Sequence, residues 1–501
     1  MKEKMERFRQ LIGEISDLEN TMSVLGWDQQ VNMPENGAEA RSMQLATLAG
    51  LAHSKFVGTE MGQTLEALKP FLADLHPDSD EYCLISRTAE EYEKQKKVPT
   101  SFVAEFSRVT TMGQQAWEKA KSASDFSKFQ PNLEKIIEMR REYAGFFAPY
   151  DHVYDPLLDD FEPGLKAADV RRVFEEIKPQ QVELLQAIVD KGPVIDDSLL
   201  YLHYDEDKQW NFGVDVIEKF GFDFTSGRQD RSIHPFTTEF GHGDVRITTH
   251  FDTEFLSMAL FGTMHEAGHA MYEQGVSKSL SRTMLHHGAS LAVHESQSRM
   301  WENLVGRSLP FWKAFYPRLQ ELFPENLGNV GLNAFYRAVN KVEPSLIRIF
   351  ADEMTYNLHI MLRFDLELAM MQGDLEAADL PEAWNSKMQE YLGITPPNDA
   401  KGVLQDVHWS GGMIGYFTTY ALGNLIASML WEKILEDIPN LESGFEKAEF
   451  APLLDWLREN VHRHGSKYKP MDLVKKVTGK ALTAEPYMRY LRSKFGEIYD
   501  L

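Results

Sequence analysis

Apolar residues recur at steps of three and four along most of this 501-residue chain, and this period constrains the fold more than any other feature. On an α-helix such residues line one face, which must be buried against another element. Clusters of turn-forming Gly, Pro and Asn separate the periodic runs. The sequence therefore predicts a mostly α fold. Helices are expected within residues 5–27, 42–51, 133–147, 168–189, 255–274, 290–305, 346–371 and 412–434.

Residues 233–251 interrupt the helical pattern. The runs 236–240 and 245–251 are rich in β-branched and aromatic residues, and Gly-His-Gly-Asp lies between them. This pattern predicts a small β-hairpin immediately before the helix expected at 255–274. An exposed strand edge there would pair with an extended peptide, but a hairpin that only braces the helix explains the same residues. Both interpretations stay open.

No repeat or long linker divides the chain, so we expect residues 1–501 to form one large domain whose N-terminal and C-terminal halves wall a cleft. Acidic residues outnumber basic ones by 76 to 52, which disfavours nucleic acid and anionic membranes as partners. No apolar run reaches the ~18 residues of a membrane span, and the N-terminus has no apolar targeting segment. Cys83 is the only cysteine. These features predict a soluble cytoplasmic protein.

The sequence His-Glu-Ala-Gly-His at residues 265–269 carries the strongest chemical signal. His265 and His269 are four residues apart, so on a helix both imidazoles lie on one face and can bind one zinc ion. Glu266 lies beside them, where a carboxylate can accept a proton from water. With 16 histidines in the chain, a chance match has odds of about a few per cent. We therefore expect a metal site.

The residues around this motif predict where its helix begins and ends. Asp252 or Thr253 is expected to cap the N-terminus, and Gly275 to follow the last turn. Gly268 costs about 1 kcal/mol of helix propensity relative to alanine. Its missing side chain lets either a substrate or a second helix come close, and the sequence does not separate the two.

A catalytic zinc ion needs a third protein ligand and an open position. The metzincin class would place histidine at position 275, where this chain has glycine, so a glutamate from a later helix is expected instead. Glu295 fits that class. His286, His287 and His294 compete with it by their closeness in sequence. The competing histidines are more often hydrogen-bonded neighbours than ligands.

Further site residues are expected downstream. Arg299 occupies the position where an acid often orients a ligand histidine, so Glu302 becomes the candidate for that task. The oxyanion of a tetrahedral intermediate needs hydrogen-bond donors. His408 and either Tyr416 or Tyr420, in a glycine-rich region, are the candidates. An ordinary aromatic core is the alternative.

Several separated motifs occur in a fixed order along the chain. They are His234-Pro-Phe, Asp244-Val-Arg-Ile-Thr, residues 265–269, His294-Glu-Ser-Gln, Ile347-Arg-Ile-Phe-Ala-Asp, Gly402-Val-Leu-Gln-Asp-Val-His-Trp, and, near the N-terminus, Trp27-Asp-Gln with Met33-Pro. Together these motifs resemble the carboxypeptidase Taq family of zinc metallocarboxypeptidases. The resemblance implies an almost wholly helical fold with a deep substrate groove, similar in outline to neurolysin and angiotensin-converting enzyme. It also implies a homodimer that releases single amino acids from peptides with a free C-terminus, with broad preference.

The same resemblance assigns roles to individual residues. It gives one Zn²⁺ per chain to His265, His269 and Glu295, with Co²⁺ able to replace it, and catalysis to Glu266. Among the remaining motif residues, His234 is expected to contact substrate.

An exopeptidase must also recognise a free carboxylate, which arginine binds through its two-pronged guanidinium. We expect Arg348 to bind that carboxylate, and Arg246 with Asp244 to shape the closed end of the groove. The alternatives are structural ion pairs, Arg348 with Asp352 and Arg246 with Asp244. The chain departs from the family pattern Phe-Pro-Thr-Tyr by having Thr418 in place of the proline, so the backbone before Tyr420 lacks the φ restraint that a proline imposes.

Two other functions fit the same motif. One is an oligoendopeptidase or dipeptidyl-type zinc peptidase on a similar scaffold. The other is a non-catalytic helical protein that binds zinc for structure alone.

Overall fold

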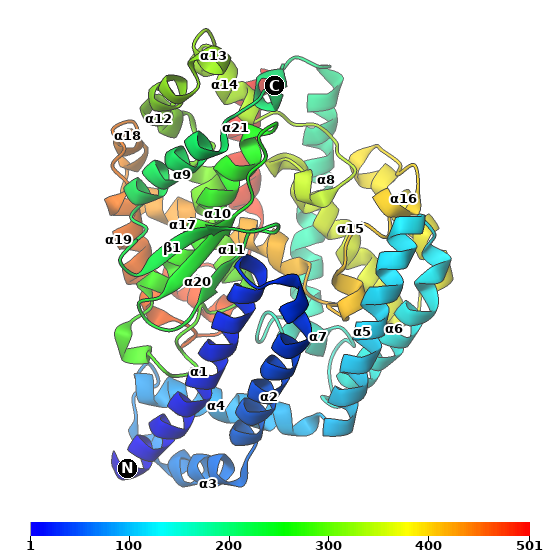
Figure 1. The fold of residues 1–501 in the computed structure, drawn as a ribbon, viewed down its shortest axis with the longest axis vertical. Helices are drawn as coiled ribbons and strands as arrows, with labels where there is room; N and C mark the ends of the chain where they lie inside the picture. The colour runs from blue at the N-terminus through cyan, green and yellow to red at the C-terminus, as the bar shows by residue number, and fades with distance from the viewer. Residues whose placement is uncertain (1) are drawn as a thin grey trace.

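The computed structural model describes residues 2–501 and confirms a mostly helical protein with a small sheet (Figure 1). The strands are β1 (Gly227–Arg231), β2 (Thr237–Glu239) and β3 (Val245–Thr249). The helices are α1 (Lys2–Val31), α2 (Ala38–Phe56), α3 (Thr59–Leu68), α4 (Asp80–Lys97), α5 (Thr100–Ala123), α6 (Gln130–Gly145), α7 (Asp155–Asp159), α8 (Ala167–Asp190), α9 (Glu206–Phe220), α10 (Leu256–Gly275), α11 (Leu291–Arg299), α12 (Leu309–Leu322), α13 (Pro324–Leu327), α14 (Leu332–Val339), α15 (Glu353–Gln372), α16 (Leu380–Leu392), α17 (Thr418–Asp437), α18 (Leu441–Phe445), α19 (Ala451–Asn460), α20 (Pro470–Thr478) and α21 (Glu485–Tyr499).

Most of the expected helices are present, and two of them begin later than predicted. The run 346–371 becomes helical only at Glu353, because the Asp352 side chain accepts hydrogen bonds from the backbone N–H groups of Met354 and Thr355 and caps α15. The run 412–434 becomes helical at Thr418, after the left-handed glycines Gly412 and Gly415. The run 290–305 forms α11 and then a π-helical turn (Met300–Val305).

The ends of α10 also differ from the prediction. Its N-cap is Phe255, not Asp252 or Thr253. Asp252 Oδ1 instead accepts a hydrogen bond from the Glu254 N–H, a turn that precedes the helix. Gly275 is the last helical residue rather than the one after it, and a Cβ there would lie 2.6 Å from His462 Cβ.

The predicted hairpin is confirmed as β2 and β3, which pair antiparallel with Thr238 opposite Arg246. A strand that was not predicted, β1, pairs parallel with β3 on its other side. Its sequence, Gly-Arg-Gln-Asp-Arg, has none of the β-branched residues that mark strands. The sheet packs on α10 through β3 and β2, so it supports the helix that carries the histidine pair.

Two large apolar clusters hold the fold together. One buries side chains from α5 to α21, and its centre includes α10, α11, α15 and α17. The other joins α1–α4 to Val276, Leu280 and Leu285, just after α10. In Figure 1 the N-terminal helices α1 and α2 form a pair that extends to one end of the molecule. Cys83 is buried in this second cluster.

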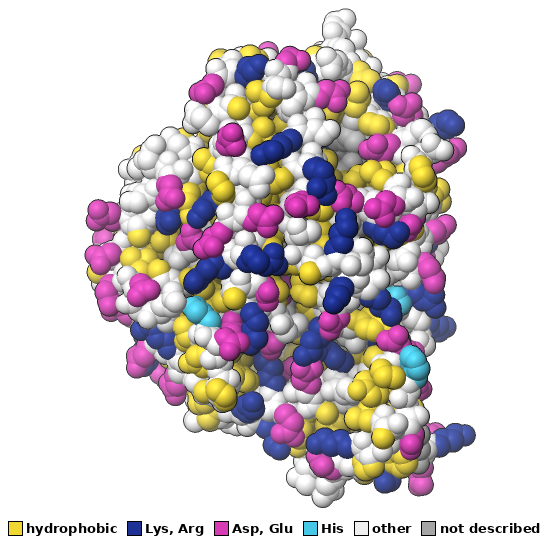
Figure 2. All heavy atoms as spheres, turned by 180° about the vertical axis from the view of Figure 1, so that it is seen from behind, with side chains coloured by type: hydrophobic (Ala, Val, Ile, Leu, Met, Phe, Trp, Pro, Cys, Tyr) yellow, Lys and Arg dark blue, Asp and Glu magenta, His cyan; other side chains and the backbone are white. Residues whose placement is uncertain are grey.

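Charged side chains of both signs are interspersed over the face drawn in Figure 2. Many form exposed ion pairs such as Arg318 with Asp215. Such exposed pairs contribute about 0–1 kcal/mol each, so the surface charge mainly favours solvation. Among residues 2–501, no helix combines the length and apolar character needed to cross a membrane.

Candidate metal centre

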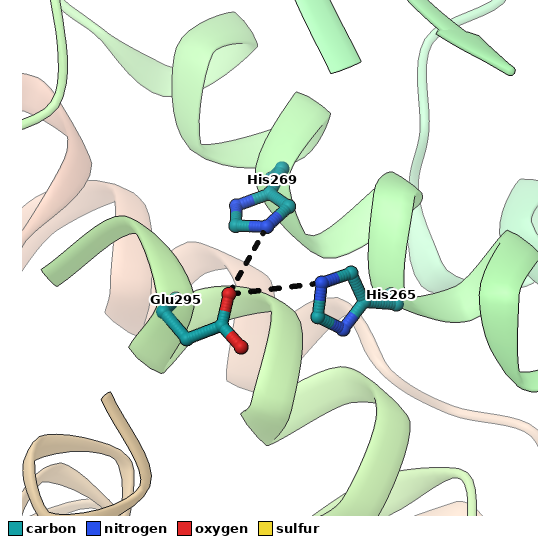
Figure 3. Close-up of side chains that lie close together, drawn as sticks. All are labelled: His265, His269 and Glu295. Carbon is teal, nitrogen blue, oxygen red and sulfur yellow. Dashed lines mark ion pairs between the residues drawn. The ribbon is translucent and has the colours of Figure 1, made fainter. Parts of the chain in front are cut away.

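Helices α10 and α11 bring three of the predicted ligands together (Figure 3). Glu295 Oε2 lies 3.7 Å from His265 Nε2 and 3.5 Å from His269 Nε2. Three atoms each ~2.1 Å from one tetrahedral ion would be about 3.4 Å apart, so this spacing fits a zinc ion closely. All three ligand atoms lie within 4.8 Å of one another. The residues present therefore fit the metal that the motif implies.

Glycines set the distance between the helices that hold these ligands. A Cβ on Gly268 of α10 would lie 2.6 Å from Ser298 Cα and 2.8 Å from the Gln297 carbonyl oxygen on α11. On the other side of α11, a Cβ on Gly423 of α17 would lie 2.6 Å from Glu295 Cγ. The missing side chain of Gly268 thus allows helix packing, which answers the question left open by the sequence.

Each of the two predicted ligand histidines is oriented through its other ring nitrogen. His265 Nδ1 lies 2.9 Å from Glu302 Oε2, so Glu302 stands where the orienting acid was expected. His269 Nδ1 lies 2.6 Å from His294 Nδ1, and His294 Nε2 lies 2.6 Å from Glu273 Oε1. His294 therefore contacts a ligand rather than joining the three-residue cluster.

The protonation states of Glu295 and His269 suit metal binding. Burial alone would raise the pKa of Glu295, but the charges of Arg299 and His265 hold it well below its ordinary value. Burial lowers the pKa of His269 to about 3, which keeps the imidazole neutral. Metals bind carboxylates and neutral imidazoles, so both groups are in the form that coordinates.

Glu266 is buried beside the ligands and is held by the sheet. Its Oε2 accepts a hydrogen bond of 2.7 Å from Thr237 Oγ1 on β2. Burial raises the pKa of the Glu266 carboxyl, opposed by the charge of His265 and by the Thr237 hydrogen bond. A raised pKa makes the Glu266 carboxylate a stronger proton acceptor, as a general base requires.

Arg348 lies in a second group of residues. Its Nε and Nη2 donate to Asp406 Oδ1 at 3.2 and 3.0 Å, and its Nη1 donates to the Tyr356 hydroxyl at 3.0 Å. The structural alternative, an ion pair of Arg348 with Asp352, is not what the structure has: Arg348 pairs with Asp406, and Asp352 caps α15. Only 5% of Arg348 is exposed. Two of its five N–H groups take no part in these three hydrogen bonds.

The aromatic candidates join the Arg348 group. The Arg348 guanidinium lies 5.0 Å from the Tyr420 ring centroid, and the Tyr420 hydroxyl donates to the Tyr416 hydroxyl at 3.5 Å. His408 packs its ring on Tyr416, with centroids 5.3 Å apart. Burial lowers the pKa of His408 to about 4, which keeps it neutral.

The remaining predicted residues lie on or next to the sheet. Arg246 makes a two-pronged ion pair with Asp244, both contacts being 2.9 Å, and its guanidinium stacks 4.5 Å from the Trp27 ring centroid. The ion pair with Asp244, which was the structural alternative for Arg246, is therefore present. His234 is exposed in the segment between β1 and β2.

Sequence reasoning missed two residues that connect these groups. Arg299 donates to Glu295 Oε1 at 2.7 Å, and its guanidinium lies 4.3 Å from the Tyr356 ring centroid. The four-residue step from Glu295 to Arg299 on a helix was a usable signal for this ion pair. Tyr356 gave no comparable signal, because neither Arg299 nor Arg348 shares an α-helix with it.

Comparisons with known proteins identify the family of this chain. The family model described as carboxypeptidase Taq (M32) metallopeptidase matches residues 7–495. Carboxypeptidase 1 of Bacillus subtilis is 38% identical, with 99% of each chain covered, and thermostable carboxypeptidase 1 of Thermus thermophilus is 41% identical, with 97% of each covered. The crystal structure of a carboxypeptidase of this family from Deinococcus radiodurans superposes with a TM-score of 0.97 at 40% identity, covering 99% of this chain and 100% of that one. The chain therefore belongs to the carboxypeptidase Taq family of metallopeptidases, which are hydrolases that act on peptide bonds.

Proposed function

We propose that this protein is a zinc-dependent metallocarboxypeptidase that releases single amino acids, with broad preference, from the free C-termini of peptides. The main support is the spacing of His265 Nε2, His269 Nε2 and Glu295 Oε2, with the Glu266 carboxylate on the same helix. Bound there, a zinc ion would polarise the peptide carbonyl and lower the pKa of water.

In this proposal Glu266 moves the proton. Its carboxylate accepts a proton from the attacking water and passes it to the leaving amine. Thr237 Oγ1 holds one carboxylate oxygen at 2.7 Å and so fixes the direction in which the other acts. His408 and Tyr420, with Tyr416 as the alternative hydroxyl, are proposed to donate hydrogen bonds to the oxyanion.

Arg348 is proposed to bind the substrate's terminal carboxylate with its two uncommitted N–H groups. Asp406 and Tyr356 hold the guanidinium in place, so little side-chain entropy would be lost on binding. Arg246, Asp244 and His234 are proposed to shape the end of a groove between the two halves of one domain. Their position beside β2 and β3 supports this placement.

Further properties are proposed from the family resemblance. They are a homodimer, a cytoplasmic location and replacement of Zn²⁺ by Co²⁺. The outline shared with neurolysin and angiotensin-converting enzyme likewise stays a prediction.

A matched pair of peptides tests the proposed function. The protein should shorten a peptide with a free C-terminus one residue at a time, as read by mass spectrometry, and leave its C-terminally amidated twin uncut. Glu266→Gln should keep its zinc and lose at least ~100-fold in kcat, because the general base is removed. Equal cleavage of both peptides at internal bonds would instead identify an endopeptidase. Undiminished turnover by Glu266→Gln would remove Glu266 from the reaction.

A further inference from the structure

A second group of acids and histidines is connected to the predicted ligand His269 through His294. Glu239 ends β2, Glu273 lies in the last turn of α10, and His287 lies in the segment between α10 and α11. One donor atom from each of the three lies within 4.8 Å of the other two. The set lines a cavity of about 250 Å³, which Glu19 and Asn20 of α1 also line.

The two carboxylates are buried, and three of their four oxygens accept no hydrogen bond from residues 2–501. Only 7% of the Glu239 side chain and 8% of the Glu273 side chain are exposed. Both Glu239 oxygens and Glu273 Oε2 lack a hydrogen-bond partner anywhere in the described part of the chain. Nδ1 of His286 and of His287 come within 2.6 and 3.3 Å of Glu239, but neither contact has hydrogen-bond geometry. Buried ionised carboxylates without partners are costly, so such an arrangement points to a bound cation.

We propose that Glu239, Glu273 and His287 form a second site for a divalent transition-metal ion, separate from the site of His265, His269 and Glu295. Two carboxylate oxygens and one imidazole nitrogen are a donor set that suits Mn²⁺ and Zn²⁺. His287 is half exposed, so an ion can reach the cavity from solvent. The ion would join β2, α10 and the segment leading to α11.

This position gives the ion a structural task. Glu273 already holds His294, which contacts the predicted ligand His269. Glu239 is two residues from Thr237, which holds Glu266. An ion between Glu239 and Glu273 would therefore fix the elements on both sides of the catalytic carboxylate.

A protonated His287 is the competing way to balance the two acids. Burial opposes the imidazolium, but Glu239 and the charge of Glu273 outweigh it and raise the pKa of His287 to about 9. A metal ion must displace that proton. Metal binding at this site therefore competes with protonation of His287. The affinity is to be measured at one fixed, mildly alkaline pH.

The proposal is tested by titrating Mn²⁺ into protein that holds a single equivalent of Zn²⁺ per chain, and by following Mn²⁺ uptake with electron paramagnetic resonance. Mn²⁺ binds most weakly of the first-row divalent ions, so it should not displace Zn²⁺ from the first site. The parent protein should take up about one Mn²⁺ per chain and show a melting temperature that rises with Mn²⁺ concentration. Glu239→Gln and His287→Ala should each bind Mn²⁺ at least ~10-fold more weakly, with unchanged zinc content.

An exposed histidine–glutamate pair provides the matched control. His203 Nδ1 lies 2.8 Å from Glu254 Oε1, with both side chains more than half exposed, so His203→Ala should bind Mn²⁺ like the parent. If Glu239→Gln fails to fold, His287→Ala still tests the site, because His287 is half exposed and its removal should be tolerated. Absence of Mn²⁺ uptake by the parent, or equal uptake by parent, His287→Ala and His203→Ala, would overturn the second site. Either result would leave the proposed peptidase function untouched, because its test uses peptides.

Discussion

The substitution Gly268→Ala should damage the metal centre far more than it damages the fold. The added Cβ would lie 2.6 Å from Ser298 Cα, whereas carbon atoms pack at ~3.5–4.0 Å, so α11 must move by about 1 Å. Overpacking of this kind costs ~1–3 kcal/mol, and the higher helix propensity of alanine returns about 1 kcal/mol. At an unfolding entropy of ~2.1 cal/mol/K per residue, the net loss lowers the melting temperature by at most about 2 °C.

The metal site should respond much more strongly. Ser298 lies three residues after Glu295 on α11, so a shift of about 1 Å also moves the Glu295 carboxylate. A misplacement of this size in a catalytic group costs on the order of 100-fold in rate. We therefore expect a large loss of kcat/KM and faster loss of zinc to a chelator, with little change in melting temperature.

Gly262→Ala on the same helix is the matched control. A Cβ there has no neighbouring atom within 4 Å among the described residues. Gly262→Ala should raise the melting temperature by about 1 °C, because alanine has the higher helix propensity, and should leave the zinc affinity unchanged. If Gly268→Ala keeps the zinc affinity and activity of Gly262→Ala, the close packing of α10 on α11 does not position Glu295.

Three further substitutions test other parts of the site. Glu302→Gln should weaken zinc binding or activity by ~10–100-fold, because His265 loses its charged partner. Zinc exchange kinetics measure the loss of affinity. An exchange rate equal to that of the parent protein would contradict the prediction. Arg348→Ala should raise KM mainly for peptides with a free carboxylate, and an equal effect on amidated peptides would make the arginine structural. Burial raises the pKa of Glu162 from 4.5 to about 8, so its contribution to stability is present below pH 4.5 and is lost as the pH rises to about 8. Glu162→Gln should flatten that dependence in melting curves, and parallel curves for the two proteins would refute the assignment.

Local periodicity predicted the helices well because each amphipathic run carries its own signal. Helix α8 matches its predicted run to within a residue at each end. The prediction failed where a side chain competes for the backbone, as Asp352 does at the start of α15. It also failed at β1, whose polar sequence becomes a strand only because β3 lies beside it.

The metal cluster was predictable for a similar reason. The step between His265 and His269 is fixed by helix geometry, whereas the choice between His294 and Glu295 depends on how α11 is rotated against α10. Gly268 contributes to that rotation, and a sequence does not show which atoms a glycine faces. The pairing of Arg348 with Asp406 could not be predicted, because Asp406 is 58 residues away along the chain.

The two halves of the proposed site are physically continuous through Arg299 and Tyr356. Arg299 donates to Glu295 Oε1, which leaves Oε2 to face the two histidines. The same guanidinium packs on the ring of Tyr356, whose hydroxyl accepts a hydrogen bond from Arg348. Tyr356 thus contacts both the arginine that orients a metal ligand and the arginine proposed to bind the substrate carboxylate. A rigid connection of this kind would fix the distance between the metal and the chain end, which is what the removal of one residue at a time requires.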